Sequence, residues 1–172
     1  GYQTEVSLDY ELDHGGFRFK LQGRADGIYS QGGRVFIEEI KTSRLDLARI
    51  DQDHNPLHWA QVKFYGYIYM EEKQLEEIEL KLTYFQLDRE ESKEFYKSFT
   101  REELGDFVHE IMDLYIGWAR LASDWAHLRD QSIRELAFPF RDYRRGQREM
   151  AVAVYRTIEE GRRIFIQAAT GI

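Results

Sequence analysis

The chain has 172 residues, 42% hydrophobic and 15% aromatic, which is enough apolar material for one domain, or one domain plus a fragment. It has no cysteine, and this excludes disulfides, thiolate zinc sites, iron–sulfur clusters and cysteine nucleophiles. Its formal net charge of −7 is not that of an electrostatic nucleic-acid binder, although a metal-dependent enzyme needs acidic ligands. No apolar run reaches the roughly 20 residues of a membrane span and no signal peptide opens the chain, so we expect a cytoplasmic protein without membrane contact.

The first forty residues alternate apolar and polar side chains, the pattern of half-buried strands. Strands are predicted over residues 3–12, 17–29 and 34–41, because Gly-containing turns at 13–16 and 30–33 separate them. Short turns join neighbouring antiparallel strands, so this part of the sequence predicts a three-stranded antiparallel meander.

Helices and strands then alternate. Asn55-Pro56 is a helix-start signal, and helical spacing of apolar residues follows from Leu57 to about Lys73. Strands are predicted at about 77–87 and 92–99. A capping box at Thr100–Glu103 starts a long helix to about Arg129, whose apolar stripe is typical of core packing. Beyond it we expect a helix over 144–160 and a short buried strand over 162–167.

Three residues of the meander carry the chemistry. Glu39 and Lys41 are two positions apart on one strand, so both project from its buried face, and Asp26 lies on the neighbouring strand. Two carboxylates and one lysine form a hard-oxygen site for Mg²⁺ or Mn²⁺ with a cation beside it. The plainer alternative is a buried Glu39–Lys41 salt bridge or a strand end that emerges into water. Glu5 on the first strand is a weaker further candidate ligand.

A second group of polar residues lies on the helix after Asn55-Pro56. Gln61 and Tyr65 are four positions apart and share one face, with His58 on nearly the same stripe. Such a face beside an acidic site can contact a nucleotide or phosphate. Alternatively, Tyr65 belongs to the core and Gln61 is solvated.

The order G-x-x-D (Gly23 to Asp26), E-I-K (Glu39 to Lys41) and Q-x-x-x-Y (Gln61 to Tyr65) resembles the PD-(D/E)XK nuclease superfamily, specifically its RecB-like branch. The resemblance covers about residues 3–100. It implies an α/β restriction-endonuclease-like core, with a mainly antiparallel mixed sheet flanked by helices. It also implies metal ligation by Asp26 and Glu39, catalysis by these two residues and Lys41, and support and DNA contact by Gln61 and Tyr65.

The sequence departs from that family in two respects. Members commonly carry an upstream helix with a metal-binding histidine, and this chain starts almost at the first strand. His14, His54 and His58 do not stand where that histidine would be, which puts the activity of the isolated segment in question. Some RecB-like members hold an iron–sulfur cluster, which the absence of cysteine excludes here.

The end of the chain carries a second resemblance. Tyr143 to Gln147, a helix, and then Ile164 to Ile172 (IFIQAATGI) resemble the entry to a DinG-like superfamily 2 helicase, whose strand runs into a phosphate-binding loop. In that comparison Gln147 reads adenine, and the next residues, absent here, would be Gly-Lys-Thr. We therefore expect ATP binding only in a longer polypeptide.

These patterns predict two regions, a RecB-like nuclease domain over 1–135 and the beginning of a helicase ATPase domain over 136–172. The predicted function is metal-dependent hydrolysis of DNA phosphodiesters within a helicase–nuclease, with DNA and the helicase portion of the same polypeptide as partners. Two alternatives stay open. One is a non-cleaving nucleic-acid-binding accessory domain of a helicase, and the other is a protein-interaction domain with a chance E-x-K.

Overall fold

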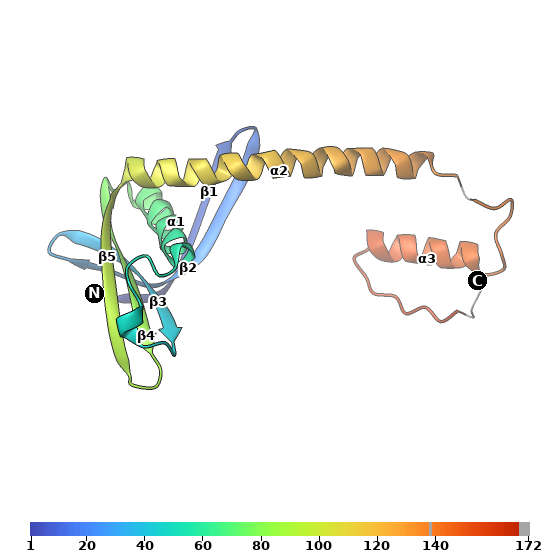
Figure 1. Ribbon diagram of the computed structural model, residues 1–172. Helices are drawn as coiled ribbons and strands as arrows, with labels where there is room; N and C mark the ends of the chain where they lie inside the picture. Colours follow the sequence, from blue (N-terminus) through green and yellow to red (C-terminus); the bar gives the residue numbers. More distant parts are fainter. Residues whose placement is uncertain (138, 169–172) are drawn as a thin grey trace. The chain divides into compact units, whose positions relative to one another are not determined.

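The computed structural model describes residues 1–137 and 139–168. It divides into two compact units, Gly1–Ser123 and Asp124–Ile172. Five strands, three α-helices and one short 3₁₀ helix follow one another in the described residues (Figure 1). The elements are β1 (Gln3–His14), β2 (Phe17–Gln31), β3 (Arg34–Ser43), η1 (Leu47–Arg49), α1 (Pro56–Lys73), β4 (Glu77–Gln86), β5 (Glu91–Thr100), α2 (Arg101–Glu135) and α3 (Gln147–Glu159).

The five strands form one mixed sheet in the order β1-β2-β3-β4-β5. All neighbouring pairs are antiparallel except β3 and β4, which are parallel. Parallel neighbours need a long crossover connection, and α1 provides it. The predicted meander is confirmed, as are the two later strands and the mixed α/β fold with helices against the sheet.

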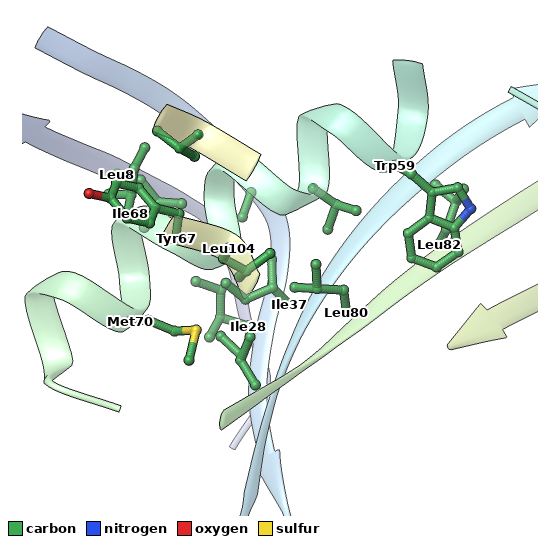
Figure 2. Close-up of a cluster of buried hydrophobic side chains, with 14 of the residues drawn as sticks. Leu8, Ile28, Ile37, Trp59, Tyr67, Ile68, Met70, Leu80, Leu82 and Leu104 are labelled. Carbon is green, nitrogen blue, oxygen red and sulfur yellow. The ribbon is translucent and has the colours of Figure 1, made fainter. Parts of the chain in front are cut away.

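One face of the sheet packs against α1 around a core of buried aliphatic and aromatic side chains (Figure 2). Asn55 caps this helix, because its side-chain oxygen accepts a hydrogen bond from the Leu57 amide, and Pro56 takes the first helical position. Gly66 allows close approach of α1 to its neighbours. A Cβ there would stand 2.9 Å from side-chain atoms of Leu80 and of Leu104.

The predicted capping box at the start of α2 is confirmed. The Glu103 amide donates to Thr100 Oγ1 (3.2 Å), and Glu103 Oε2 accepts from the Thr100 amide (2.8 Å). The prediction that the whole apolar stripe of this helix is core is wrong. Leu104 is fully buried, but Leu114 is 76% exposed, and the other exposed stripe residues are Tyr115, Trp118, Leu121 and Trp125. The buried residues of α2 are Leu104, Val108, Met112 and Ile116, and the apolar stripe continues beyond Ile116.

In the second unit, α3 is shorter than the helix predicted over 144–160. The strand predicted over 162–167 is wrong, because these residues form no strand and Phe165 is 92% exposed. A strand needs a hydrogen-bonded neighbour, and the described residues offer none here. The phosphate-loop resemblance ends on residues 169–172, which lie outside the described residues. Among the helices that are described, none is both long and apolar enough to cross a membrane.

Candidate active site

The site forms where β2 and β3 separate. Their ladder ends at the pair Gly27 and Glu38, so Asp26 and Glu39, the next residues along, do not face each other as a ladder pair. The side chain of Asp26 makes the contact to β3 in place of the backbone. Its Oδ2 accepts a hydrogen bond from the Ile40 amide (2.7 Å). This bond ties the Asp26 carboxylate to β3 at the position of Glu39 and Lys41.

A local distortion brings Asp26 to the face that α1 covers. Along β2 the less exposed side chains occupy odd positions up to Ala25, which is buried, but the next buried apolar side chain is Ile28. On β1, Glu5 is unpaired at this point and has a left-handed φ of 54°. The change of parity places Asp26 on the same side as Ile28 and its ladder partner Ile37. The Glu5 carboxylate itself pairs with Arg24 (2.8 Å) and is 62% exposed.

Four of the predicted residues form a continuous chain of hydrogen bonds. Lys41 Nζ donates to Glu39 Oε1 (2.6 Å) and to Gln61 Oε1 (2.8 Å). Gln61 Nε2 in turn donates to the Tyr65 hydroxyl (2.9 Å). The contacts orient the Gln61 amide, since its oxygen faces an ammonium and its nitrogen faces a phenol. The structure thus brings these residues of β3 and α1 together, and Asp26 is linked to them by its hydrogen bond from the Ile40 amide.

Gly23 connects the first motif to the third. A Cβ at Gly23 would lie 2.3 Å from Cε1 of Tyr65, a distance that real contacts do not show. The missing side chain therefore makes room for the Tyr65 ring against β2. The sequence marked Gly23 only as the start of G-x-x-D, and no signal in the sequence alone linked it to Tyr65.

Glu39 is the least satisfied charged group of the site. Its side chain is only 5% exposed, and its Oε2 is buried without a hydrogen-bond partner among the described residues. Burial raises the pKa of Glu39 and the nearby Asp26 charge adds to this, although the Lys41 hydrogen bond acts in the opposite direction. A buried carboxylate oxygen without a donor costs free energy, and such an oxygen is available to an additional cation.

A family model of the PD-(D/E)XK nuclease superfamily matches residues 2–145 of this sequence. The chain belongs to this superfamily. The match includes the whole sheet, both helices that pack on it and every candidate residue of the site. PD-(D/E)XK proteins are generally metal-dependent nucleases, so membership of the superfamily suggests a nuclease domain.

A solved structure titled "Crystal structure of SSO0001" is similar at 26% identity, with a TM-score of 0.43. The similarity covers 66% of this chain and 50% of that one, so this chain spans half the length of the protein it matches. No curated protein matches the sequence.

The donor set of the site fits a hard divalent cation. Within residues 1–137 and 139–168, no group of three or more His, Asp or Glu side chains forms a ready metal cage. Mg²⁺ does not need one, because it usually binds one or two carboxylates and completes its shell with water and substrate phosphate. Asp26 and Glu39 supply two carboxylates, and the unpartnered Glu39 Oε2 is the oxygen that a cation would satisfy.

The remaining candidates lie elsewhere. His14 Nε2 contacts Asp113 Oδ1 (2.7 Å), and its ring stacks on that of His109. Gln147 is the first residue of α3, where its Oε1 accepts from the Arg144 amide (2.8 Å). Its predicted role in adenine recognition stays a prediction.

Proposed function

We propose that this chain is a RecB-like nuclease module that hydrolyses phosphodiester bonds of DNA with the help of Mg²⁺ or Mn²⁺. The observation that carries the proposal is the Glu39 carboxylate. It is buried and bonded through one oxygen to Lys41, and its second oxygen is unpartnered within the described chain. A purely structural Glu39–Lys41 ion pair would satisfy both oxygens, because an orphaned buried carboxylate oxygen is destabilising.

Asp26 and Glu39 would hold the cation. When bound, it supplies a Lewis acid at the phosphate and lowers the pKa of a bound water. Asp26 is suited to this role because its Oδ2 already has a donor in the Ile40 amide, which fixes the carboxylate without involving its Oδ1. The Asp26 side chain is partly exposed, so substrate can approach the site from that side.

Lys41 acts on the phosphate. Its ammonium has three N–H donors, of which Glu39 and Gln61 accept two. The third donates to a non-bridging phosphate oxygen while the water oxygen bonds to phosphorus and the bond to the leaving oxygen breaks. The attacking water gives up one proton to solvent, and the leaving oxygen takes one from solvent. A donor already in place where negative charge develops needs no reorganisation during the reaction.

Gln61 and Tyr65 keep the lysine in place. The Gln61 carbonyl accepts from Lys41, and the hydrogen bond from its amide nitrogen to Tyr65 prevents the amide from turning over. Because Gln61 contacts Lys41 and Tyr65 contacts Gln61, a DNA strand bound at Lys41 would lie near both side chains. The superfamily membership supports DNA as the substrate.

The second unit extends the proposal to a larger protein. Tyr143, Gln147 and the IFIQAATGI sequence resemble the start of a helicase ATPase domain, so we infer that the nuclease works in a helicase–nuclease polypeptide that binds ATP. The intact Asp26, Glu39 and Lys41 favour cleavage over a passive strand-guiding role.

The test uses end-labelled single- and double-stranded DNA, incubated with the chain in Mn²⁺ or Mg²⁺ and, separately, in EDTA. Lys41→Ala is compared with Lys73→Ala, whose lysine is half exposed and pairs with its neighbour Glu72. We expect cleavage in wild type and Lys73→Ala, and none in Lys41→Ala or in EDTA. The same assay on the longer polypeptide, with and without ATP, tests the helicase–nuclease inference.

Two outcomes would overturn the proposal. Equal DNA binding by all three proteins without cleavage would favour the accessory-domain alternative. Cleavage that persists in Lys41→Ala would place the chemistry elsewhere. The length distribution of the labelled products distinguishes cutting from an end from cutting within the strand.

A further inference from the structure

A second hydrogen-bonded chain, Asn55–His58–Tyr84, lies next to Lys41. Tyr84 is the β4 residue that pairs with Lys41 across the parallel β3–β4 ladder, so its side chain lies beside the lysine. His58 Nδ1 is 2.8 Å from the Tyr84 hydroxyl, and His58 Nε2 is 3.1 Å from Asn55 Nδ2. His58 precedes Gln61 by three residues on α1, so it lies close to the face that contacts Lys41.

The directions of these hydrogen bonds follow from the helix cap. Asn55 Oδ1 accepts from the Leu57 amide, so the Asn55 amide nitrogen is the atom that faces His58. An amide nitrogen can only donate, which makes Nε2 of His58 an acceptor without a proton. The Nδ1 of a neutral imidazole then carries the hydrogen and donates it to the Tyr84 oxygen. This fixes His58 as the Nδ1–H tautomer.

The surroundings of His58 disfavour its charged form. Burial lowers the pKa of His58, and the positive charge of Lys41 and the neighbouring His54 lower it further. On the strand side, Tyr84 is buried and its pKa is raised by burial and by Asp51, so the hydroxyl is neutral. A second cation beside Lys41 would compete with it for Glu39 and for the phosphate.

We propose that His58 is a positioning residue of this site, held neutral between Asn55 and Tyr84 so that the first two turns of α1 are fixed against β4 and Gln61 meets Lys41. Gln61 lies less than one turn after His58, so a shift of this part of α1 moves its carbonyl relative to the ammonium. The consequence for catalysis rests on the proposed function, whereas the tautomer and the position of Gln61 do not.

Three variants separate this role from general support of the fold. His58→Asn places an amide nitrogen near the position of Nδ1 and can still donate to Tyr84, whereas His58→Gln places its amide near Nε2 and cannot. Tyr84→Phe removes the acceptor and keeps the ring. His54→Gln is the matched control, because His54 touches Tyr84 only edge to face.

For DNA cleavage we expect about a 10-fold fall in kcat for His58→Gln and Tyr84→Phe with KM unchanged, less than the 10²-fold that a 1 Å misplacement can cost. His58→Asn should recover most of the rate and His54→Gln should keep it. Equal losses in His58→Asn and His58→Gln, or a loss only in KM, would overturn the positioning role.

Asn55→Asp gives a test with a different readout. Aspartate keeps the helix cap but has no N–H to donate, so Nε2 would face a carboxylate and gain a proton. In ¹⁵N-labelled chain, we expect the Nδ1–H tautomer at His58 in wild type near neutral pH and a charged ring in Asn55→Asp. An Nε2–H tautomer or a charged ring in wild type would overturn the inference.

The NMR experiment is independent of nuclease activity. The Gln61 side-chain amide resonance should shift in His58→Gln and stay in place in His54→Gln. If wild type does not cleave DNA, the proposed function fails, while the tautomer and the Gln61 resonance still decide whether His58 positions α1. An unmoved Gln61 resonance in His58→Gln would overturn the inference even in an active nuclease.

Discussion

Two adjacent glutamates on β3, Glu38 and Glu39, are about equally buried, but their carboxylates differ in how completely they are hydrogen-bonded. Glu38 points to the face opposite α1, where it accepts hydrogen bonds from Tyr2 (2.7 Å), Thr83 (2.5 Å) and Lys81 (3.0 Å). Glu39 points to the α1 face and has one partner, Lys41, with its second oxygen unpartnered among the described residues. The first cluster is complete without a ligand, and the second is not.

The pKa values of Glu38 and Glu39 shift in opposite directions, in agreement with their different hydrogen bonding. Burial alone would raise the pKa of Glu38, but the hydrogen bonds from Thr83, Tyr2 and Lys81 outweigh it and hold that pKa below its ordinary value. The pKa of Glu39 is raised, because burial outweighs its single hydrogen bond. Complete hydrogen bonding therefore marks a structural carboxylate, and incomplete bonding at equal burial marks one available for a cation.

The largest expected effect is a difference in DNA cleavage between variants of the two glutamates. Glu39→Gln removes a charge from the proposed cation site and should reduce DNA cleavage about 10³-fold. Glu38→Gln alters the opposite face and should leave the cleavage rate of folded protein within a few-fold of wild type. The measurement is kcat on labelled DNA for protein that remains folded by circular dichroism. Equal losses in both variants would mean that the comparison does not distinguish function from structure.

Stability should respond in the opposite order. Glu38→Gln leaves Lys81 and two hydroxyl donors poorly matched, and we expect a loss of about 3 kcal/mol in the free energy of unfolding. Glu39→Gln removes a charge that burial penalises, so its effect at neutral pH should be between zero and a gain of about 1 kcal/mol. Urea unfolding measures both. A larger loss in Glu39→Gln than in Glu38→Gln would contradict the assignment of the unsatisfied carboxylate.

A third variant tests how tightly the site is packed. Gly23→Ala forces a methyl group into the Tyr65 ring, so we expect a destabilisation of about 2 kcal/mol and a weakened Tyr65–Gln61–Lys41 chain. Gly105→Ala on α2 is the control, since a Cβ there meets nothing within 4 Å and alanine favours a helix. If Gly23→Ala is as stable and as active as wild type, the Tyr65 ring is not held against β2.

Much of the site could be predicted from the sequence because its parts are local patterns. The two-residue spacing in E-I-K puts Glu39 and Lys41 on one face of a strand, and Q-x-x-x-Y puts Gln61 and Tyr65 on one face of a helix. The contacts between these elements are not local. The change of parity at Asp26, the space that Gly23 leaves for Tyr65 and the pairing of Tyr84 with Lys41 all depend on how strands and helix meet.

The wrong predictions have the same origin. The apolar stripe on α2 has helical periodicity, but periodicity does not tell how many of its residues are buried. Residues 162–167 are apolar like a buried strand, and a strand also needs a neighbour that the sequence of this segment does not reveal.

The smallest expected effect concerns a single hydrogen bond at Glu38. Tyr2→Phe removes one of three donors, and because the Tyr2 side chain is half exposed we expect a loss of only about 0.5–1 kcal/mol at neutral pH. The pKa of Glu38 in the folded chain lies below its unfolded value, so its contribution is present above the ordinary glutamate range and is lost as pH falls through the folded pKa.

Removing a donor raises that folded pKa toward the unfolded one, so the contribution of Glu38 becomes smaller and its loss on acidification is complete at a higher pH. The difference in unfolding free energy between wild type and Tyr2→Phe should therefore shrink as pH falls below about 4, where glutamates become protonated in both states. Urea unfolding from pH 7 to pH 3 measures this. If the two proteins are equally stable at every pH, Tyr2 stabilises the sheet through its ring, which stacks on Tyr29 and which the variant keeps, and not through its hydroxyl.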